Sequence, residues 1–155
     1  MNVIKSLKQL FVKNKVQPKT KEELKKIIKD TIKRKGNKCN LNFIDTSLIT
    51  DMSDLFAFSK FNGNISKWNT SNVEDMSWMF LESEFNRDIS KWNISKVKNM
   101  SCIFLGSKFN QDISSWDITN IDTHDMYRNC PLNSHPDFMP FVSCKVTPYV
   151  SIKRS

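Results

Sequence analysis

The feature that most constrains this chain is an eight-residue segment that occurs three times with a constant spacing of 24 residues. It begins at Phe61, Phe85 and Phe109, and its second copy reads Phe-Asn-Arg-Asp-Ile-Ser-Lys-Trp. A fixed period of this size predicts stacked structural units, each too small to bury its own apolar face. Residues that recur in every unit are therefore expected to build the stack, and few of them point to chemistry.

A second phrase recurs between these copies with the same period and ends at Phe56, Phe80 and Phe104. The two phrases place apolar residues at corresponding positions, so each unit contributes a layer to one core. Burying a large apolar side chain is worth roughly 1.5–3 kcal/mol, and several layers together offset the entropy of ordering the chain. The predicted repeat core consists of Trp68, Trp92, Trp116, Phe61, Phe85, Phe109, Phe56, Phe80, Phe104, Ile65, Ile89, Ile113, Met52, Met76 and Met100.

The array runs from residue 44 to residue 132, and its last unit fits the period only if one residue is lost. Recurrent serines at positions 53, 77 and 101 are expected to start turns or short helices, and Trp78 is expected to lie on such a helix. The segment 65–68 and its copies are the best candidates for a short strand. Its apolar residues are three apart, which breaks simple alternation and predicts a bend.

The phrase from Phe85 to Phe104 resembles, almost throughout, the repeat of the BspA-like leucine-rich-repeat surface proteins, in its mycoplasma-type form of unknown function. The resemblance covers about residues 18–132. It implies a non-catalytic protein-binding module, related to adhesion or host interaction, and it provides no catalytic residue to carry over. Period and resemblance together predict an α/β repeat solenoid with leucine-rich-repeat-like turns of 24 residues, an N-terminal capping helix and an irregular C-terminal cap.

The expected organisation is one basic N-terminal segment followed by one repeat domain. Residues 1–17 form the basic segment, either a short helix or a flexible tail, and residues 18–155 form the domain. Within the domain, residues 18–43 are the capping helix and lead-in, 44–132 the repeats, and 133–155 the C-terminal cap. We expect a monomer.

Charge is unevenly distributed along the sequence. Residues 1–38 hold 13 Lys and Arg against 3 Asp and Glu, a net charge of +10, whereas residues 39–155 carry −2. The whole formal charge of +8 therefore comes from the N-terminal segment.

An amphipathic helix is predicted from Thr20 to Lys35, with Thr20 as N-cap, Glu23 in the capping-box position and Gly36 ending it. Its apolar face consists of Leu24, Ile27, Ile28 and Ile32. This helix either lays its apolar face on the first repeat or attaches the chain to nucleic acid or an acidic membrane surface, through the basic residues between Lys19 and Lys38.

The N-terminus lacks the continuous apolar run that a signal peptide needs, and no stretch is long enough to span a bilayer. A cytoplasmic location is the expectation from the residues. The family resemblance implies the alternative, which is the cell surface or secretion by an unconventional route.

A search of the sequence for catalytic chemistry predicts that the chain is not an enzyme. Four cysteines (Cys39, Cys102, Cys130 and Cys144) and two histidines show no zinc-binding spacing. We expect the cysteines to be reduced apolar residues, with a bridge between Cys130 and Cys144 open if the protein is exported. No cofactor, metal or small-molecule substrate is indicated. Asp88 and Asp112 occupy one column as a carboxylate pair, but Asn64 fills the same column and favours a hydrogen-bonding corner.

The positions that differ between copies are the candidates for binding, because variable columns point outward. The column of Asp54, Trp78 and Cys102 stands out, since exposed aromatic residues are enriched in binding hot spots. The alternative is that Trp78 packs on a neighbouring unit or on the helix. Lys67 and Lys91 share another column and form a small basic ridge or are merely solvated. A protein partner, bound through Trp78, Lys67, Lys91 and Asp54, is the predicted ligand.

Overall fold

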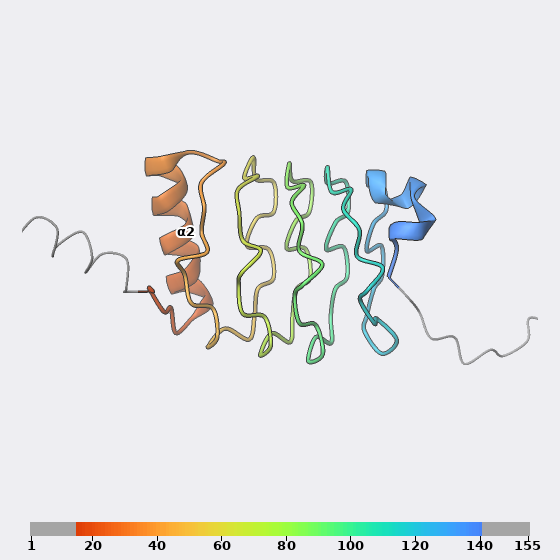
Figure 1. The fold of residues 1–155 in the computed structure, drawn as a ribbon, viewed down its shortest axis with the longest axis horizontal. Coiled ribbons are helices and arrows are strands. Elements are labelled where there is room, and N and C mark those ends of the chain that lie inside the picture. The colour runs from red at the N-terminus through yellow and green to blue at the C-terminus, as the bar shows by residue number, and fades with distance from the viewer. Residues whose placement is uncertain (1–14, 141–155) are drawn as a thin grey trace, which may run out of the picture.

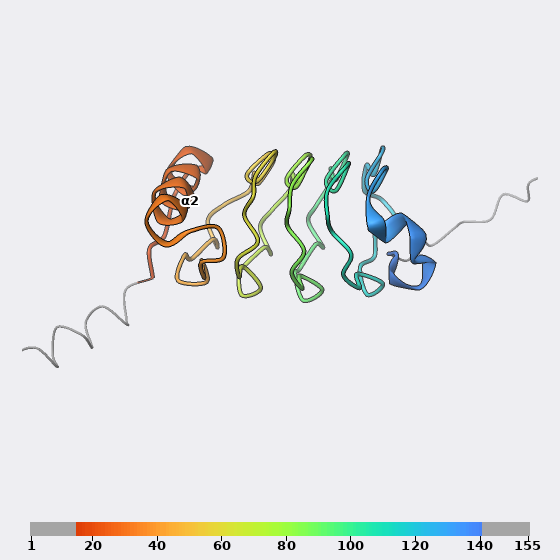
Figure 2. The same cartoon turned by 90° about the horizontal axis from the view of Figure 1, so that it is seen from above.

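A computed structural model describes residues 15–140 of the 155-residue chain. The repeats form coils stacked along one axis, with helix α2 at one end and two short helices at the other (Figures 1 and 2). Isolated parallel bridges join Asp51 to Asp75, Asp75 to Asn99 and Asn99 to Asp122. The first two steps are 24 residues and the last is 23, so the predicted loss of one residue in the final unit is confirmed.

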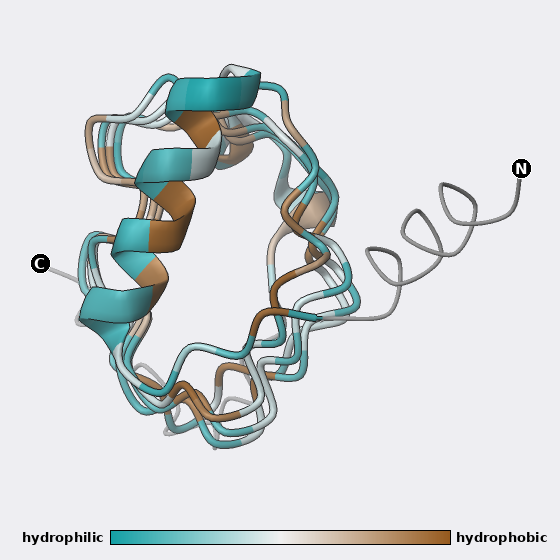
Figure 3. Cartoon of the chain, turned by 90° about the vertical axis from the view of Figure 1, so that its left-hand side faces the viewer, coloured by the Kyte–Doolittle hydropathy of each residue, from teal (hydrophilic) through white to brown (hydrophobic). Residues whose placement is uncertain are grey.

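Helix α2 spans Lys21–Lys35 and confirms the predicted helix. The N-cap Thr20 side chain accepts a hydrogen bond from the Glu23 amide at 3.2 Å, and the Glu23 carboxylate accepts one from the Lys19 amide at 2.7 Å. The helix ends at Gly36, whose φ of +80° suits a residue without Cβ. Leu24, Ile28 and Thr31 of the helix are buried, and Ile27 and Ile32 pack partly buried against the core. Hydrophobic segments recur along one side of the helix ribbon (Figure 3).

The predicted α/β fold class, with its leucine-rich-repeat-like turns in an α/β solenoid, is wrong. Residues 15–140 contain one α-helix, two 3₁₀-helices and no strand, only the isolated bridges. The coils are nevertheless joined by a regular ladder. The amides of Met52, Asp54, Phe56 and Phe58 donate to carbonyl oxygens of the next coil at 2.7–3.0 Å, and the same pattern recurs from coil to coil.

The reason for the missing strands is that each ladder segment is a succession of tight turns. Ala57 donates to the carbonyl of Asp54, and Ser59 to that of Phe56, so alternate amides close local turns. Two columns in each coil have left-handed backbone: Asp54, Phe58, Trp78, Glu82, Cys102, Gly106, Asp125 and Asn129 all have φ between +50° and +65°. A segment with two left-handed residues four positions apart cannot extend into a regular strand.

Two further local predictions are also wrong. The segment 65–68 is a turn rather than a strand, closed by the Trp68 amide donating to the Ile65 carbonyl at 3.1 Å. The bend that the three-residue spacing predicts is confirmed. Trp78 lies in a left-handed turn position with φ +55°, rather than on a short helix.

The corners of each coil are built by Asx turns, in which an Asp or Asn side chain accepts a hydrogen bond from the amide two residues later. In the second coil these residues are Asp75, Asp88 and Asn93, which accept from the amides of serines 77, 90 and 95 at 2.7–2.9 Å. The recurrent serines are thus turn residues. Both Asn and Asp occur within each column because both carry the acceptor oxygen that the turn needs.

The core consists of aromatic stacks that run along the axis of the array. The rings of Phe56, Phe80 and Phe104 stack with centroids 5.7 Å apart, and a parallel stack joins Phe61, Phe85 and Phe109 at 6.2–6.3 Å. Trp68 and Trp92 stack at 6.4 Å. All fifteen residues of the predicted repeat core are buried, with at most 4% of each exposed.

The C-terminal end of the stack contains two 3₁₀-helices, η1 at Pro131–Ser134 and η2 at Pro136–Phe138. Leu132 is fully buried, and Phe138 packs partly buried against the core. The Ile113 amide donates to the Phe138 carbonyl at 3.0 Å, which ties this segment to the last coil. The proposed cap from 133 to 155, like the basic segment 1–17, lies partly outside the described residues.

Candidate partner-binding surface

The outward side chains of residues 54–58, 78–82 and 102–106 form one continuous surface, which we call the ladder face. Backbone hydrogen bonds hold the coils in register. The Asp54 amide donates to the Ser77 carbonyl, and the Trp78 amide donates to the Ser101 carbonyl, both at 3.0 Å. Side chains in one column therefore lie beside each other on successive coils. Asp54, Trp78 and Cys102 form one such column, and Phe58, Glu82 and Gly106 form another.

Trp78 and Phe58 are large apolar side chains exposed on the ladder face, with 50% and 73% of their surfaces accessible. The Phe58 amide bonds to the carbonyl of Leu81, which lies three residues after Trp78 and is itself partly exposed. The two aromatic residues thus lie on adjacent coils, in different columns of the ladder face. Half of the Trp78 surface is open to solvent, and the other half is covered by the rest of the protein.

Phe58 was not among the residues selected from the sequence. The pattern that reveals it is the same one that selected Trp78: its column holds Phe, Glu and Gly in successive copies, so it is variable and outward-facing. Phe58 lies two residues after Phe56, whose column holds phenylalanine in every copy, and such an apolar run suggests a buried segment.

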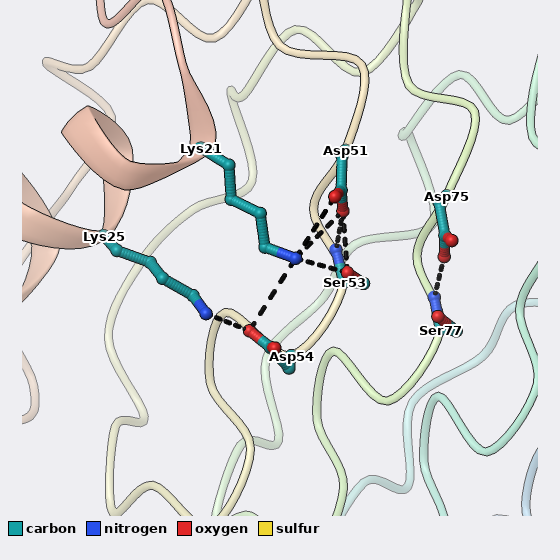
Figure 4. A network of polar contacts seen from close by, with 7 residues as sticks. All are labelled: Lys21, Lys25, Asp51, Ser53, Asp54, Asp75 and Ser77. Atoms are coloured by element: carbon teal, nitrogen blue, oxygen red, sulfur yellow. Dashed lines mark hydrogen bonds and ion pairs between the residues drawn. The ribbon is translucent and has the colours of Figure 1, made fainter.

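Asp54, the other predicted residue of the Trp78 column, is already engaged by helix α2 (Figure 4). Its carboxylate forms ion pairs with Lys25 and, at 3.9 Å, with Lys21. Lys21 also binds both carboxylate oxygens of Asp51, at 3.1 and 3.2 Å, and the Ser53 hydroxyl. This network fixes α2 on the first coil, so Asp54 serves internal attachment.

The electrostatics of this network favour the charged carboxylate. Partial burial of Asp51 favours its protonated form, but the hydrogen bonds from Ser53 and the charge of Lys21 outweigh that effect, so the pKa of Asp51 is lowered. Ionised Asp51 therefore contributes to the attachment of α2.

An open apolar groove lies between α2 and the first coil, next to Phe58. Its volume is about 600 Å³, and its lining comes from one face of the helix and one edge of the ladder face. The lining residues are Lys25, Ile28, Lys29, Ile32, Lys33, Leu55, Phe56, Ala57, Phe58 and Ser59. Volumes in this range are usual for ligand-binding clefts.

The structure does not bring Lys67 and Lys91 together with Trp78. Both lysines are exposed, and each follows the Asx corner at Asn64 or Asp88, whereas Trp78 follows the corner at Asp75. They share a column on adjacent coils, as the period predicts. The predicted binding residues therefore fall into two separate groups.

The carboxylates considered for acid–base chemistry are structural. Backbone and side-chain hydrogen bonds from Ser90 lower the pKa of Asp88, and those from Ser114 lower the pKa of Asp112. Asn64 makes the same bonds with Ser66, at 3.0 and 2.8 Å. A general-acid pair needs one carboxyl group with a raised pKa, whereas the pKa values of both these carboxylates are lowered. Within residues 15–140, no group of three or more His, Cys, Asp or Glu side chains is arranged to hold a metal.

The cysteines in the described part of the chain are free thiols. Cys39 and Cys130 are buried, and burial raises the pKa of each thiol. Cys130 takes the column of Ser59, Ser83 and Ser107, and its thiol donates to the Phe109 carbonyl at 2.9 Å. Cys144 lies outside the described residues, so the alternative of a bridge to Cys130 in an exported protein is not tested.

A stack of 24-residue coils, with a helix at one end and two exposed aromatic side chains on one face, defines a repeat protein. The chain belongs to the family described as Mycoplasma protein of unknown function, DUF285, whose model matches residues 22–137. The mycoplasma-type part of the resemblance is thereby confirmed. No curated protein and no solved structure gives a significant match.

Helix α2, at 15 residues and rich in lysine, is the longest helix in residues 15–140. In that part of the chain, no helix combines the length and the hydropathy needed to cross a membrane.

Proposed function

We propose that this chain is a non-catalytic protein-binding module whose partner contacts the ladder face. The observation that carries the proposal is the exposure of Trp78 and Phe58 on adjacent coils, at 50% and 73%. Large aromatic side chains provide much of the free energy of association in protein interfaces, and a folded protein gains nothing from leaving them in water.

The variation between copies supports the same proposal. At the position of Trp78 the neighbouring coils hold Asp54 and Cys102, and at that of Phe58 they hold Glu82 and Gly106. The coil therefore folds with small or polar residues at these positions, and folding does not require the aromatic ones. The resemblance to BspA-like surface proteins adds the expectation that the partner belongs to an adhesion or host-interaction system.

The test exchanges residues between copies, so that each variant carries a side chain that its column already accepts. Trp78→Asp and Phe58→Glu, combined in one protein, remove both aromatic side chains. The control is Glu84→Lys, an exposed position at which both neighbouring coils hold lysine. Each purified protein is immobilised and exposed to extract from the cells that produce it and, separately, from cells of its host, and bound proteins are quantified by mass spectrometry.

We expect the wild type and the control to recover the same partner, and the double variant to lose it while its melting temperature stays within a few degrees of the wild type. Recovery of the same partner by the double variant would overturn the assignment to the ladder face.

A second candidate function is attachment to an anionic surface through α2. The observation in its favour is that Lys26, Lys29 and Lys33 are exposed, while Lys21 and Lys25 are neutralised by acidic residues of the first coil. Binding of this kind weakens steeply with salt. Titration with duplex DNA and with vesicles containing phosphatidylserine, at two salt concentrations, tests it. Absence of binding at low salt would exclude this function.

A further inference from the structure

The groove between α2 and the first coil has an apolar lining that no described residue fills. Ile28 and Ile32 from the helix face Leu55, Ala57 and Phe58 from the coil. Leu55 and Ile28 are buried beneath it, whereas Phe58 is mostly exposed at its edge. The groove is therefore concave and apolar, and its lining includes one largely exposed aromatic side chain.

The helix side of the groove carries uncompensated positive charge. Lys25 is paired with Asp54, but Lys29 and Lys33, which line the same groove, form no ion pair with any residue between 15 and 140. Both lysines are exposed. Two positive charges next to an apolar cleft are complementary to an apolar ligand with flanking carboxylates.

The parts of this chain outside the described residues do not match that requirement. Segments 1–14 and 141–155 contain lysine and arginine but no aspartate or glutamate. Either segment would add positive charge to a rim that is already positive. Charge complementarity thus favours an occupant from another molecule.

We propose that this groove binds an acidic amphipathic segment of a partner protein, with its apolar side chains against Phe58 and its carboxylates at Lys29 and Lys33. The proposal rests on the protein-binding function and names the chemistry of the partner where the ladder face meets α2. From Lys25 to Lys33 the helix rises about 12 Å, enough for roughly two turns of a bound helix. A concave cleft suits a side-chain-bearing segment, whereas a flat bilayer surface would leave it unfilled.

The probe is a synthetic, fluorescently labelled 16-residue helix-forming peptide with leucines along one face and glutamates elsewhere. Its matched control carries lysines in place of the glutamates. Fluorescence anisotropy measures binding to the full chain, to a Lys29→Gln/Lys33→Gln variant and to Phe58→Gly. The charge-matched control protein is Lys60→Gln/Lys108→Gln, which neutralises two exposed lysines that do not line the groove.

We expect the acidic peptide to bind the full chain and the control protein equally, and the lysine peptide to bind neither. Loss of the two rim charges weakens binding roughly 3- to 10-fold, and Phe58→Gly weakens it roughly 10-fold or more. Three results overturn the proposal: no binding of the acidic peptide, equal binding of both peptides, or equal weakening by both lysine pairs.

Binding of phosphatidylserine vesicles but not of the acidic peptide, lost in the Lys29→Gln/Lys33→Gln variant, also overturns it in favour of a lipid ligand. A partner capture that depends on Trp78 but not on Lys29 and Lys33 overturns the groove proposal alone and leaves the protein-binding function in place.

Discussion

Two phenylalanines that are two residues apart in the same coil should differ strongly in how far their substitution lowers the free energy of unfolding. Phe56 is 1% exposed, and its ring stacks on Phe61 at 4.5 Å, on Phe80 at 5.7 Å and on Trp68 at 5.9 Å. Replacing a buried phenylalanine by alanine costs about 3–5 kcal/mol, because the cavity cannot close. Phe56→Ala should therefore remove a large part of a free energy of unfolding that is typically about 5–15 kcal/mol.

Phe58 is 73% exposed and has a left-handed backbone, with φ +56°. A left-handed conformation costs a residue with a side chain roughly 1–2 kcal/mol, and glycine avoids that cost. The greater conformational freedom of glycine in the unfolded chain opposes this gain by about 0.5–1 kcal/mol. Loss of the partial contacts of the phenylalanine ring lowers the free energy of unfolding further. Phe58→Gly should therefore change the free energy of unfolding by less than about 1 kcal/mol, as Gly106 in the same column suggests.

Urea unfolding followed by tryptophan fluorescence compares the two variants, since the chain contains four tryptophans. The midpoint should fall strongly for Phe56→Ala and stay near the wild-type value for Phe58→Gly, with similar slopes. A third variant, Phe58→Ala, keeps the left-handed strain and should be no more stable than Phe58→Gly. If Phe58→Gly destabilises the protein as much as Phe56→Ala, Phe58 belongs to the core, and the argument for an exposed binding residue fails.

Two other predictions follow from the same geometry. A Cβ on Gly63 would lie 2.0 Å from the backbone oxygen of Cys39. Gly63→Ala should therefore lower the free energy of unfolding by about 1–3 kcal/mol or more. An unchanged thermal melting temperature would show that the segment before the first coil does not contact this coil so closely. Because the pKa of Asp51 is lowered, the folded state binds fewer protons at this group than the unfolded state does. The stabilising effect of ionised Asp51 is therefore present above the ordinary pKa of 3.8 and is lost as the pH falls through the folded-state pKa. Asp51→Asn keeps an acceptor for the Ser53 amide, and its melting temperature should fall less than that of the wild type between about pH 5 and pH 2; parallel curves would show that Asp51 does not contribute to acid sensitivity.

The candidate surface was only partly accessible from the sequence. Comparison of copies identifies Trp78, because its column varies and holds a large aromatic residue. The same comparison also identifies Phe58 as variable, but residues 55–58 are all apolar, and such a run is typical of a buried segment. The groove could not be found in this way, since it forms between Ile28 and Ile32 on the helix and residues that follow more than twenty positions later. Asp54 also required the structure, which pairs it with Lys25.

The sequence by itself determined the period, the buried columns, the helix at residues 21–35 and the shortened last unit, because each depends on spacing and residue type alone. Only the tertiary structure decided the backbone conformation of the ladder segments. Left-handed residues are usually glycine or asparagine, but here Phe58, Trp78 and Cys102 adopt this conformation. Hydrogen bonds between neighbouring coils and the aromatic stacks beneath them stabilise it, and these interactions exist only once the coils are assembled.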